Sequence, residues 1–526
     1  MAETPKTTQS APKQAKAPKK SAAKTQEQKK PKVAVLVIHG IGEQRPMATL
    51  NSFVDAVWRE DGVLFPPPQD GDEESTFDAA QTWYKPDYIS GLFELRRITT
   101  RGITVEDTAA DSGETTRFDF FEYYWAHHMR GHMVSDLLDW LRFVFARPRK
   151  AVPDDLRWIW VAGWSLVGVF ALGALIWLLD GLFGFAPRWG AAIATIGAVG
   201  SAIFGIIMRK ILPIVGDAAR YLNAAPRNIA IRQKIRDDGL KLLDQLHKSG
   251  DYKRIIVVGH SLGSVIAYDI VSLAWSSSHF GARRGRSETS RVGKAFKALE
   301  RLGLDLLGRG EDPEIDRDKR APYRDAQRSL FQALRADKEC LWRVSDLVTI
   351  GSPLSKASVL LAADDTLFEE LKDRRDLPTA PPAYEAAFPG ATFKTQFTYG
   401  KKESRKTHHA APFGPVVWTN IYVPHEYLLR GDIISGTVHN QLGPAIADVE
   451  VPIDGTADPT GSWLETLFGQ NIRHTHYWSL DKGSFSETSL KAVRRALNLR
   501  GKTEEKGLWD GQENAVPIRA EKLGDV

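Results

Sequence analysis

The chain has 526 residues, of which 43% are hydrophobic and 26% charged, and these proportions indicate a globular protein with a buried core. Its net charge of +5 comes from residues 1–32, which hold nine Lys and two Glu; the remainder carries −2, which argues against a nucleic-acid-binding domain. One cysteine, Cys340, excludes an intrachain disulfide and favours a reducing compartment, and we expect it to be a packing residue.

Both ends of the chain have the composition of polar tails. Residues 1–32 are rich in Lys, Ala, Pro and Gln and have no aromatic residue, so they cannot bury enough apolar surface to offset the entropy of ordering. We therefore predict a disordered basic tail over 1–32, which lacks the apolar core of a secretory signal. It is either a solubilising tail or a basic arm that contacts anionic lipid. Residues 501–526 form a second polar tail.

Short apolar runs that alternate with helical patterns predict an α/β fold with a mainly parallel sheet. The run 33–38 reads Val-Ala-Val-Leu-Val-Ile and is apolar on both faces, as in a strand buried in a parallel sheet. Residues 61–115 give no clear pattern. Residues 281–340 are charged and mostly helical, and they form either a lid or a surface excursion. Further strands are predicted at 117–125, 254–258, 347–350, 416–423 and 448–451, and helices at 47–58, 228–247 and 265–273.

Two long uncharged segments interrupt this pattern, at 158–179 and at 189–208. At about 1.5 Å of rise per residue, each is long enough to cross an apolar layer of roughly 30 Å as a helix. Tryptophans lie near the segment ends, as interfacial aromatics do, and the second segment is rich in Gly. We predict a transmembrane hairpin over 158–208. The alternatives are two buried core helices or a hairpin within one leaflet.

Basic residues flank the hairpin on both sides. The turn between its helices carries one basic residue, Arg188, against Asp180. The positive-inside rule therefore places both flanks, and with them the termini, in the cytoplasm. Residues 33–150 and 220–500 would then form the two parts of one α/β domain. The flanking residues are Arg142, Arg147, Arg149, Lys150 and Arg157 before the hairpin, and Arg209, Lys210 and Arg220 after it.

The sequence Gly259-His260-Ser261-Leu262-Gly263 matches Gly-x-Ser-x-Gly. It follows a predicted buried strand and precedes a predicted helix, which is the setting of a nucleophile elbow. In such an elbow the serine lies on a sharp turn, so the residues two positions away on either side must be small. The helix N-terminus beneath the hydroxyl favours negative charge. The alternative is an ordinary glycine-rich turn between a strand and a helix.

A serine hydroxyl needs a base within hydrogen-bond distance and a third group that orients the base. In this type of fold the acid and then the histidine follow the serine in the chain. Asp432, in the turn Gly-Asp-Ile-Ile-Ser-Gly, is the preferred acid and Glu426 the alternative. His474 is the preferred base and His476 the alternative. Four other histidines fit the strand order less well: His408, His409, His425 and His439.

The negative charge of a tetrahedral intermediate requires backbone N–H donors fixed in advance. One donor is predicted at Leu262, directly after the nucleophile. The other is predicted at Ile41, in the His39-Gly40-Ile41-Gly42 loop, with Gly42 as the next candidate. Because His39 precedes the serine in the chain, we expect it to be structural.

These pieces together resemble the α/β-hydrolase superfamily, in its lipase and serine-esterase branch. The matching segments are 37–42, 257–266 and 348–354, the last containing Gly-Ser-Pro, together with the loops of Asp432 and His474. The resemblance covers about 33–60 and 225–480. It implies hydrolysis of carboxylic esters through an acyl-enzyme, without a metal or an organic cofactor. The inserted hairpin departs from the soluble members of the family.

The sequence therefore predicts a membrane-anchored serine hydrolase that acts on a small-molecule or lipid ester. The anchor suggests a lipid-like substrate. Two alternatives remain. The same triad could transfer the acyl group to an alcohol or thiol, since both reactions share the first half-reaction. The chain could also be a non-catalytic membrane protein with a hydrolase-like fold.

Overall fold

A computed structural model describes most of the chain beyond residue 31. Residues 1–30 and 31–526 form separate units, and every residue described below belongs to the second. The described residues are 32–40, 45–65, 80–92, 94–107, 111–129, 148–149, 152, 157, 160–165, 167–169, 171–173, 175, 221, 226–277, 281, 283–307, 317–362, 364–386, 394–425, 431–452, 474, 476–480 and 484–500.

The described residues form one nine-stranded mixed sheet, which is parallel over six adjacent strands and antiparallel at one edge. In spatial order the strands are β13 (Ala447–Glu450), β12 (Val417–Tyr422), β7 (Val344–Ile350), β6 (Tyr252–His260), β1 (Lys32–Ile38), β5 (Asp111–Tyr123), β3 (Arg96–Thr100) and β2 (Thr82–Pro86), while β4 (Ile103–Asp107) pairs with β5. Two small antiparallel pairs lie outside it: β8 (Glu385–Ala386) with β9 (Lys394–Thr395), and β10 (Thr398–Tyr399) with β11 (Lys406–Thr407).

The central strands are apolar on both faces because helices cover both. In β1, Ala34, Leu36 and Ile38 join one core cluster, whereas Val33, Val35 and Val37 join the other. This alternation follows from the two-residue period of a strand. The continuous apolar run at 33–38 is thus explained by a strand with no solvent face, as predicted.

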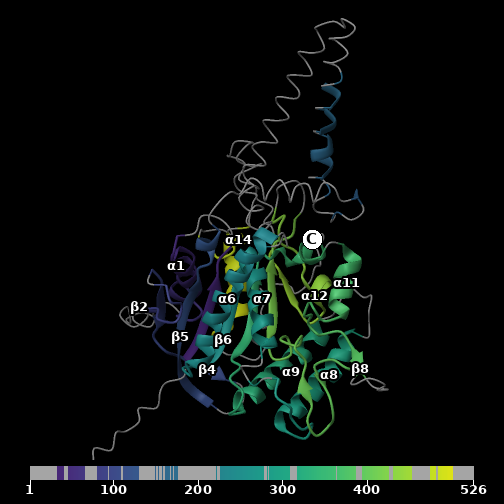
Figure 1. Ribbon diagram of the computed structural model, residues 1–526. Coiled ribbons are helices and arrows are strands. Elements are labelled where there is room, and N and C mark those ends of the chain that lie inside the picture. Colours follow the sequence, from purple (N-terminus) through teal and green to yellow (C-terminus); the bar gives the residue numbers. More distant parts are fainter. Residues whose placement is uncertain are drawn as a thin grey trace, which may run out of the picture. The chain divides into compact units, whose positions relative to one another are not determined.

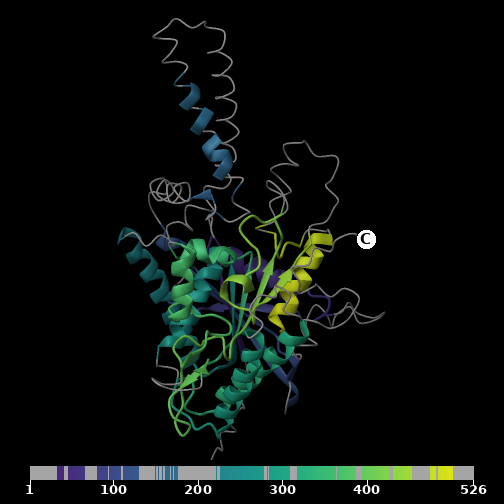
Figure 2. The same cartoon turned by 90° about the vertical axis from the view of Figure 1, so that its right-hand side faces the viewer.

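Helices cover the two faces of the sheet (Figures 1 and 2). The helices α6 (Pro226–Lys248) and α7 (Leu262–Ser276) pack on one face, and α8 (Arg291–Leu307) and α9 (Arg317–Ala336) contribute to the same core. On the other face lie α1 (Ala48–Val54), the π-helix η1 (Asp55–Arg59) and α14 (Ser484–Leu497). The shorter helices are η2 (Ala126–His128), η5 (Pro353–Lys356), α10 (Ala357–Leu361), α11 (Asp365–Asp373) and α12 (His439–Leu442).

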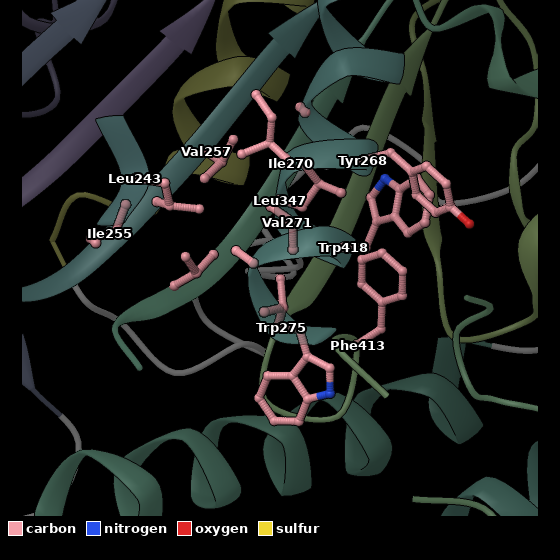
Figure 3. Close-up of a cluster of buried hydrophobic side chains, with 14 of the residues drawn as sticks. Leu243, Ile255, Val257, Tyr268, Ile270, Val271, Trp275, Leu347, Phe413 and Trp418 are labelled. Atoms are coloured by element: carbon pink, nitrogen blue, oxygen red, sulfur yellow. The ribbon is translucent and has the colours of Figure 1, made fainter. Parts of the chain in front are cut away.

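Helix α7 is the most deeply packed of these helices, and its first residue directly follows Ser261. Its apolar side chains meet those of β6 and β7 (Figure 3). Tyr268 of α7 contacts Trp418, with ring centroids 5.6 Å apart. The ring of Phe413 contacts the same indole, with centroids 4.7 Å apart. Gly239 of α6 lets the helices approach closely, because an added Cβ would lie 2.2 Å from Ile270 Cδ1. The core thus fixes the helix that starts at Ser261.

The predicted α/β architecture with a mainly parallel sheet is confirmed. The strands predicted at 33–38, 254–258, 347–350, 416–423 and 448–451 correspond to β1, β6, β7, β12 and β13. The strand predicted at 117–125 begins earlier, at Asp111, because its first half pairs with β4 in an antiparallel hairpin. Strands β2, β3 and β4 lie within residues 61–115. Several of their residues are exposed, so these strands lack the continuous apolar run of a buried strand.

The predicted hairpin over 158–208 falls mostly on residues outside the described part of the chain. Residues 160–165, 167–169 and 171–173 are helical. In the part of the chain that the structure describes, no helix combines the length and apolar character needed to cross a bilayer. The charged region 281–340 is largely helical where it is described, as predicted, since it contains α8 and α9.

We expect the packing of α7 to dominate the stability of this core. Ile270 is fully buried and Leu273, on the same helix, is 38% exposed. Replacing Ile270 with Ala should lower the free energy of unfolding by about 2–5 kcal/mol, since it removes buried apolar contacts and leaves a cavity. Leu273→Ala should cost less than about 1 kcal/mol. Urea unfolding of both variants measures the difference, and equal losses would contradict the packing described here.

Candidate active site

Ser261 lies on a sharp turn between β6 and α7. Its backbone has φ 53° and ψ −130°, a region that residues with a Cβ adopt at a cost of about 1–3 kcal/mol. The turn is held by the backbone N–H of Ser261, which donates to the carbonyl of Ile350 on β7 at 2.9 Å. The strand–turn–helix geometry predicted from Gly-x-Ser-x-Gly is therefore present.

The two glycines of this motif are required by close backbone contacts. A Cβ added to Gly259 would lie 2.5 Å from Ser264 Cα, and one added to Gly263 would lie 2.3 Å from the carbonyl oxygen of Ile38. The second contact brings the start of α7 against the end of β1. The small residues on either side of the serine thus allow β1, β6 and α7 to converge at the nucleophile.

The structure brings Ser261, His474 and Asp432 together in one chain of hydrogen bonds. Ser261 Oγ lies 2.7 Å from His474 Nε2, and His474 Nδ1 lies 2.9 Å from Asp432 Oδ2. An ionised carboxylate can only accept, so Nδ1–H donates to Asp432 and the free Nε2 accepts from the serine hydroxyl. All three residues are buried, with exposed fractions of 2%, 4% and 1% in the order serine, histidine, aspartate.

Asp432 is held in its ionised form. Burial alone would raise the pKa of Asp432, but the charge and hydrogen bond of His474, the Tyr477 hydroxyl and the backbone N–H of Ile434 lower it to about 2. Its second oxygen, Oδ1, accepts from the backbone N–H groups of Ile434 at 3.0 Å and Ser435 at 3.3 Å. The carboxylate therefore carries a full negative charge beside the imidazole at neutral pH.

Tyr477 is a member of this network that the sequence analysis missed. Its hydroxyl donates to Asp432 Oδ2 at 2.8 Å and accepts from the backbone N–H of Val423 at 3.1 Å. It also lies 3.0 Å from Ser435 Oγ. The available signal was its position three residues after His474, in the same His-Thr-His-Tyr-Trp segment.

Gly351, from the Gly-Ser-Pro segment after β7, leaves room for the same network. Its φ is +59°, and an added Cβ would lie 2.8 Å from Tyr477 Cε2. The same Cβ would be 3.4 Å from both Asp432 Oδ2 and His474 Cε1. The hydroxyl oxygen of the next residue, Ser352, lies 2.7 Å from Ser264 Oγ. The Ser264 hydroxyl in turn donates to the Ser261 carbonyl at 2.5 Å. The Gly-Ser-Pro segment therefore packs against the triad and against the first turn of α7.

The remaining predicted site residues are placed as follows. His476 has no hydrogen bond to Ser261 or Asp432 among the described residues, so the geometry favours His474 as the base. Leu262 is the first residue of α7, and its N–H is among those that lack a partner inside the helix. The alternative acid Glu426 and the oxyanion candidates Ile41 and Gly42 lie outside the described residues.

The loop after β1 begins directly against the nucleophile. A Cβ added to Gly40 would lie 2.8 Å from Ser261 Cβ and 2.8 Å from His260 Nδ1. The preceding His39 stacks on Trp125 at a ring distance of 5.1 Å, and Trp125 Nε1 donates to the His39 carbonyl at 2.8 Å. Burial lowers the pKa of His39 to about 4, so the ring is neutral. His39 thus anchors the start of the loop, and Gly40 lies beside the serine.

A buried carboxyl group, Glu122, lies at the far end of this loop. Its Oε2 accepts from the backbone N–H of Met47 at 2.6 Å, whereas Oε1 is buried without a hydrogen-bond partner in the described structure. Burial raises the pKa of Glu122 to about 7, and the Met47 N–H only partly offsets this. Met47 itself has φ 71° and precedes α1. The carboxyl therefore links β5 to Met47, the residue directly before α1.

Comparison with protein-family models, with curated proteins and with solved structures finds no match to this chain. The interpretation of the site therefore depends on its own geometry. Among the described residues, no group of three or more His, Cys, Asp or Glu side chains is arranged to hold a metal ion. The chemistry that the arrangement supports is nucleophilic attack by an activated serine.

We expect Gly351→Ala to disturb the triad without touching any of its members. The added methyl group would push Tyr477 and the Asp432–His474 pair apart, and a misalignment of this kind should slow the reaction of Ser261 with a fluorophosphonate by about tenfold or more. Gly400→Ala is the matched control, because Gly400 also has a positive φ, +95°, but the nearest atom is 3.6 Å away. Equal rates in both variants would contradict the steric role of Gly351.

We expect Glu122 to make stability depend on pH. Its folded pKa of about 7 lies above the ordinary 4.5, so the folded chain binds the proton more tightly than the unfolded chain. The free energy of unfolding should therefore fall as pH rises from about 4.5 to about 7. Glu122→Gln should remove this loss and stabilise the protein at pH 8 by about 3 kcal/mol relative to its effect at pH 4.

The measurement for Glu122 is thermal or urea unfolding at both pH values. The exposed Glu370 on α11 provides the control, since Glu370→Gln removes a carboxylate that is not buried. A wild-type protein and a Glu122→Gln variant with parallel pH profiles would show that burial of this carboxyl has no energetic consequence.

Proposed function

We propose that this protein is a serine hydrolase that cleaves carboxylic esters through an acyl-enzyme. The observation that carries the proposal is the continuous hydrogen-bonded chain from Ser261 Oγ through His474 to Asp432. It is supported by the strained turn at Ser261, which places the hydroxyl at the N-terminus of α7. The same geometry and roles recur in serine hydrolases of unrelated folds. The similarity of the sheet and elbow to an α/β-hydrolase is part of this proposal.

Each member of the chain has one chemical task. His474 Nε2 takes the proton of Ser261 as Oγ attacks the acyl carbonyl, and it then protonates the leaving alcohol oxygen. In the second half-reaction His474 removes a proton from water, whose oxygen attacks the acyl-enzyme; the bond between the acyl carbon and Ser261 Oγ then breaks, His474 returns the proton to Oγ, and the acid leaves. Asp432, ionised because its pKa is about 2, orients the imidazole and stabilises its cationic form.

The oxyanion that forms on the carbonyl needs two donors. We propose the backbone N–H of Leu262, at the start of α7, as one of them. We propose the N–H of Ile41 as the other. The contact of Gly40 with Ser261 supports this assignment, because it brings the beginning of the loop within van der Waals distance of the nucleophile.

We also propose that residues 158–208 anchor the protein in a membrane, with the catalytic domain and both termini on the cytoplasmic side. The flanking basic residues support this orientation. Within the described helical residues, large apolar side chains are exposed to an extent that is unusual for a water-soluble surface. They are Val161, Trp164, Val167, Leu172 and Leu175, with exposed fractions of 41–55%. A membrane anchor on the same chain favours a lipid-like ester as substrate.

The first test is covalent labelling of the full chain in detergent with a fluorophosphonate. We expect Ser261→Ala to abolish labelling and to reduce ester hydrolysis by several orders of magnitude, because Ser261 is the nucleophile that lies within hydrogen-bond distance of His474 among the described residues. Asp432→Asn should lower kcat by about 10⁴-fold. Ser272→Ala is the matched control, since Ser272 is also a buried serine on α7. Labelling that survives in Ser261→Ala would overturn the assignment of the nucleophile.

The second test measures the rate for aryl esters of increasing acyl length, with and without an added alcohol or thiol. Faster cleavage of long chains supports a lipid-like substrate, whereas a preference for acetate contradicts it. An acylated acceptor in place of free acid would identify the protein as an acyltransferase with the same triad. A folded wild type that neither reacts with the fluorophosphonate nor cleaves any of the esters would favour the alternative of a non-catalytic membrane protein with a hydrolase-like fold.

A further inference from the structure

The base of the proposed triad lies in a segment that has no regular secondary structure. His474 and residues 476–480 are neither helical nor in a strand. Among the described residues, the only backbone hydrogen bond within this segment joins Ser479 N–H to the His476 carbonyl. In the described part of this segment, the contacts that position the imidazole therefore come from side chains of other elements.

One such side chain is His260, the residue directly before the nucleophile. Its ring Nε2 lies 2.8 Å from the backbone carbonyl oxygen of His474, across 214 positions of sequence. His260 is the last residue of β6, so its backbone is fixed in the sheet opposite Ile350. The residue is 9% exposed, and its ring makes an edge contact with Trp478, with ring centroids 4.9 Å apart. The donor is thus held rigidly.

The hydrogen bond has a defined direction. The carbonyl oxygen of His474 can only accept, so His260 Nε2 must carry the proton. Burial, and next to it the nearby His474 imidazole, lower the pKa of His260 to about 3. The ring is therefore neutral over the whole range in which a serine–histidine pair works, and the donor does not change with pH. His260 Nδ1 faces Gly40, whose added Cβ would lie 2.8 Å away.

We propose that His260 is a positioning residue that holds the catalytic base in place through its backbone. Two adjacent residues then hold His474 at two points: Ser261 Oγ contacts the imidazole, and the His260 ring contacts the backbone of the same residue. Together with Asp432, these contacts fix both the position and the tilt of the imidazole. The inference rests on the proposed function, because it assigns a role to the residue that precedes the proposed nucleophile.

The test compares two variants of similar side-chain length that differ in the donor. Gln carries an amide N–H that can replace the ring Nε2–H, whereas Met cannot donate. We expect His260→Met to lower the rate of fluorophosphonate labelling and the kcat for an aryl ester by about 10–100-fold, with KM changed less than threefold. His260→Gln should remain within about fivefold of wild type. All rates are measured well below the unfolding temperature of each variant.

His247 supplies the matched control. It is also a buried, neutral histidine, and its Nδ1 lies 2.7 Å from the Leu243 carbonyl within α6. His247→Met and His247→Gln should change the unfolding temperature without changing the labelling rate of the folded protein. Such a result, with the expected split at His260, separates positioning from general stabilisation.

The outcomes distinguish this inference from the proposed function. Labelling of the wild type together with wild-type rates in His260→Met would overturn the role of His260 and leave the triad intact. Equal losses in the Met and Gln variants would also overturn it, because the ring size and not the donor would then matter. A folded wild type that does not label would overturn the proposed function, and the inference with it.

Discussion

The turn at Ser261 is the constraint on which the site depends. A residue with a Cβ has a positive φ there, and the surrounding sheet and helix must stabilise it. Gly259 and Gly263 allow the backbones of β1, β6 and α7 to meet at this point, and the fully buried face of α7 prevents the turn from relaxing. The backbone strain is thus confined to Ser261, whereas the packing that stabilises it comes from the whole core.

The three members of the triad are held in different ways. Ser261 is fixed by the sheet and α7, and Asp432 by backbone N–H groups of its own turn. Among the described residues, His474 is contacted by side chains from other elements, His260 among them. Tyr477 connects the two loops, because it lies in the segment of His474 and donates to Asp432. The position of the imidazole therefore depends on contacts between segments that are distant in the sequence.

This difference explains what could be predicted from the sequence. The central strands could be predicted because burial on both faces makes 33–38 and 254–258 largely apolar. The elbow could be predicted because close backbone contacts require glycine on both sides of the serine. The choice between His474 and His476 was open because the spacing within one irregular segment does not say which ring meets Ser261. The contacts of Tyr477 and Gly351 with the triad were not predicted, because they join segments distant in sequence.

Burial of the triad has two opposing consequences for the proposed reaction. With Ser261 2% exposed, the interactions among Ser261, His474 and Asp432 act in a medium of low polarity, which strengthens them. The same burial means that an ester reaches the hydroxyl only after the groups that cover it move apart. Turnover would thus include an opening step besides acyl transfer.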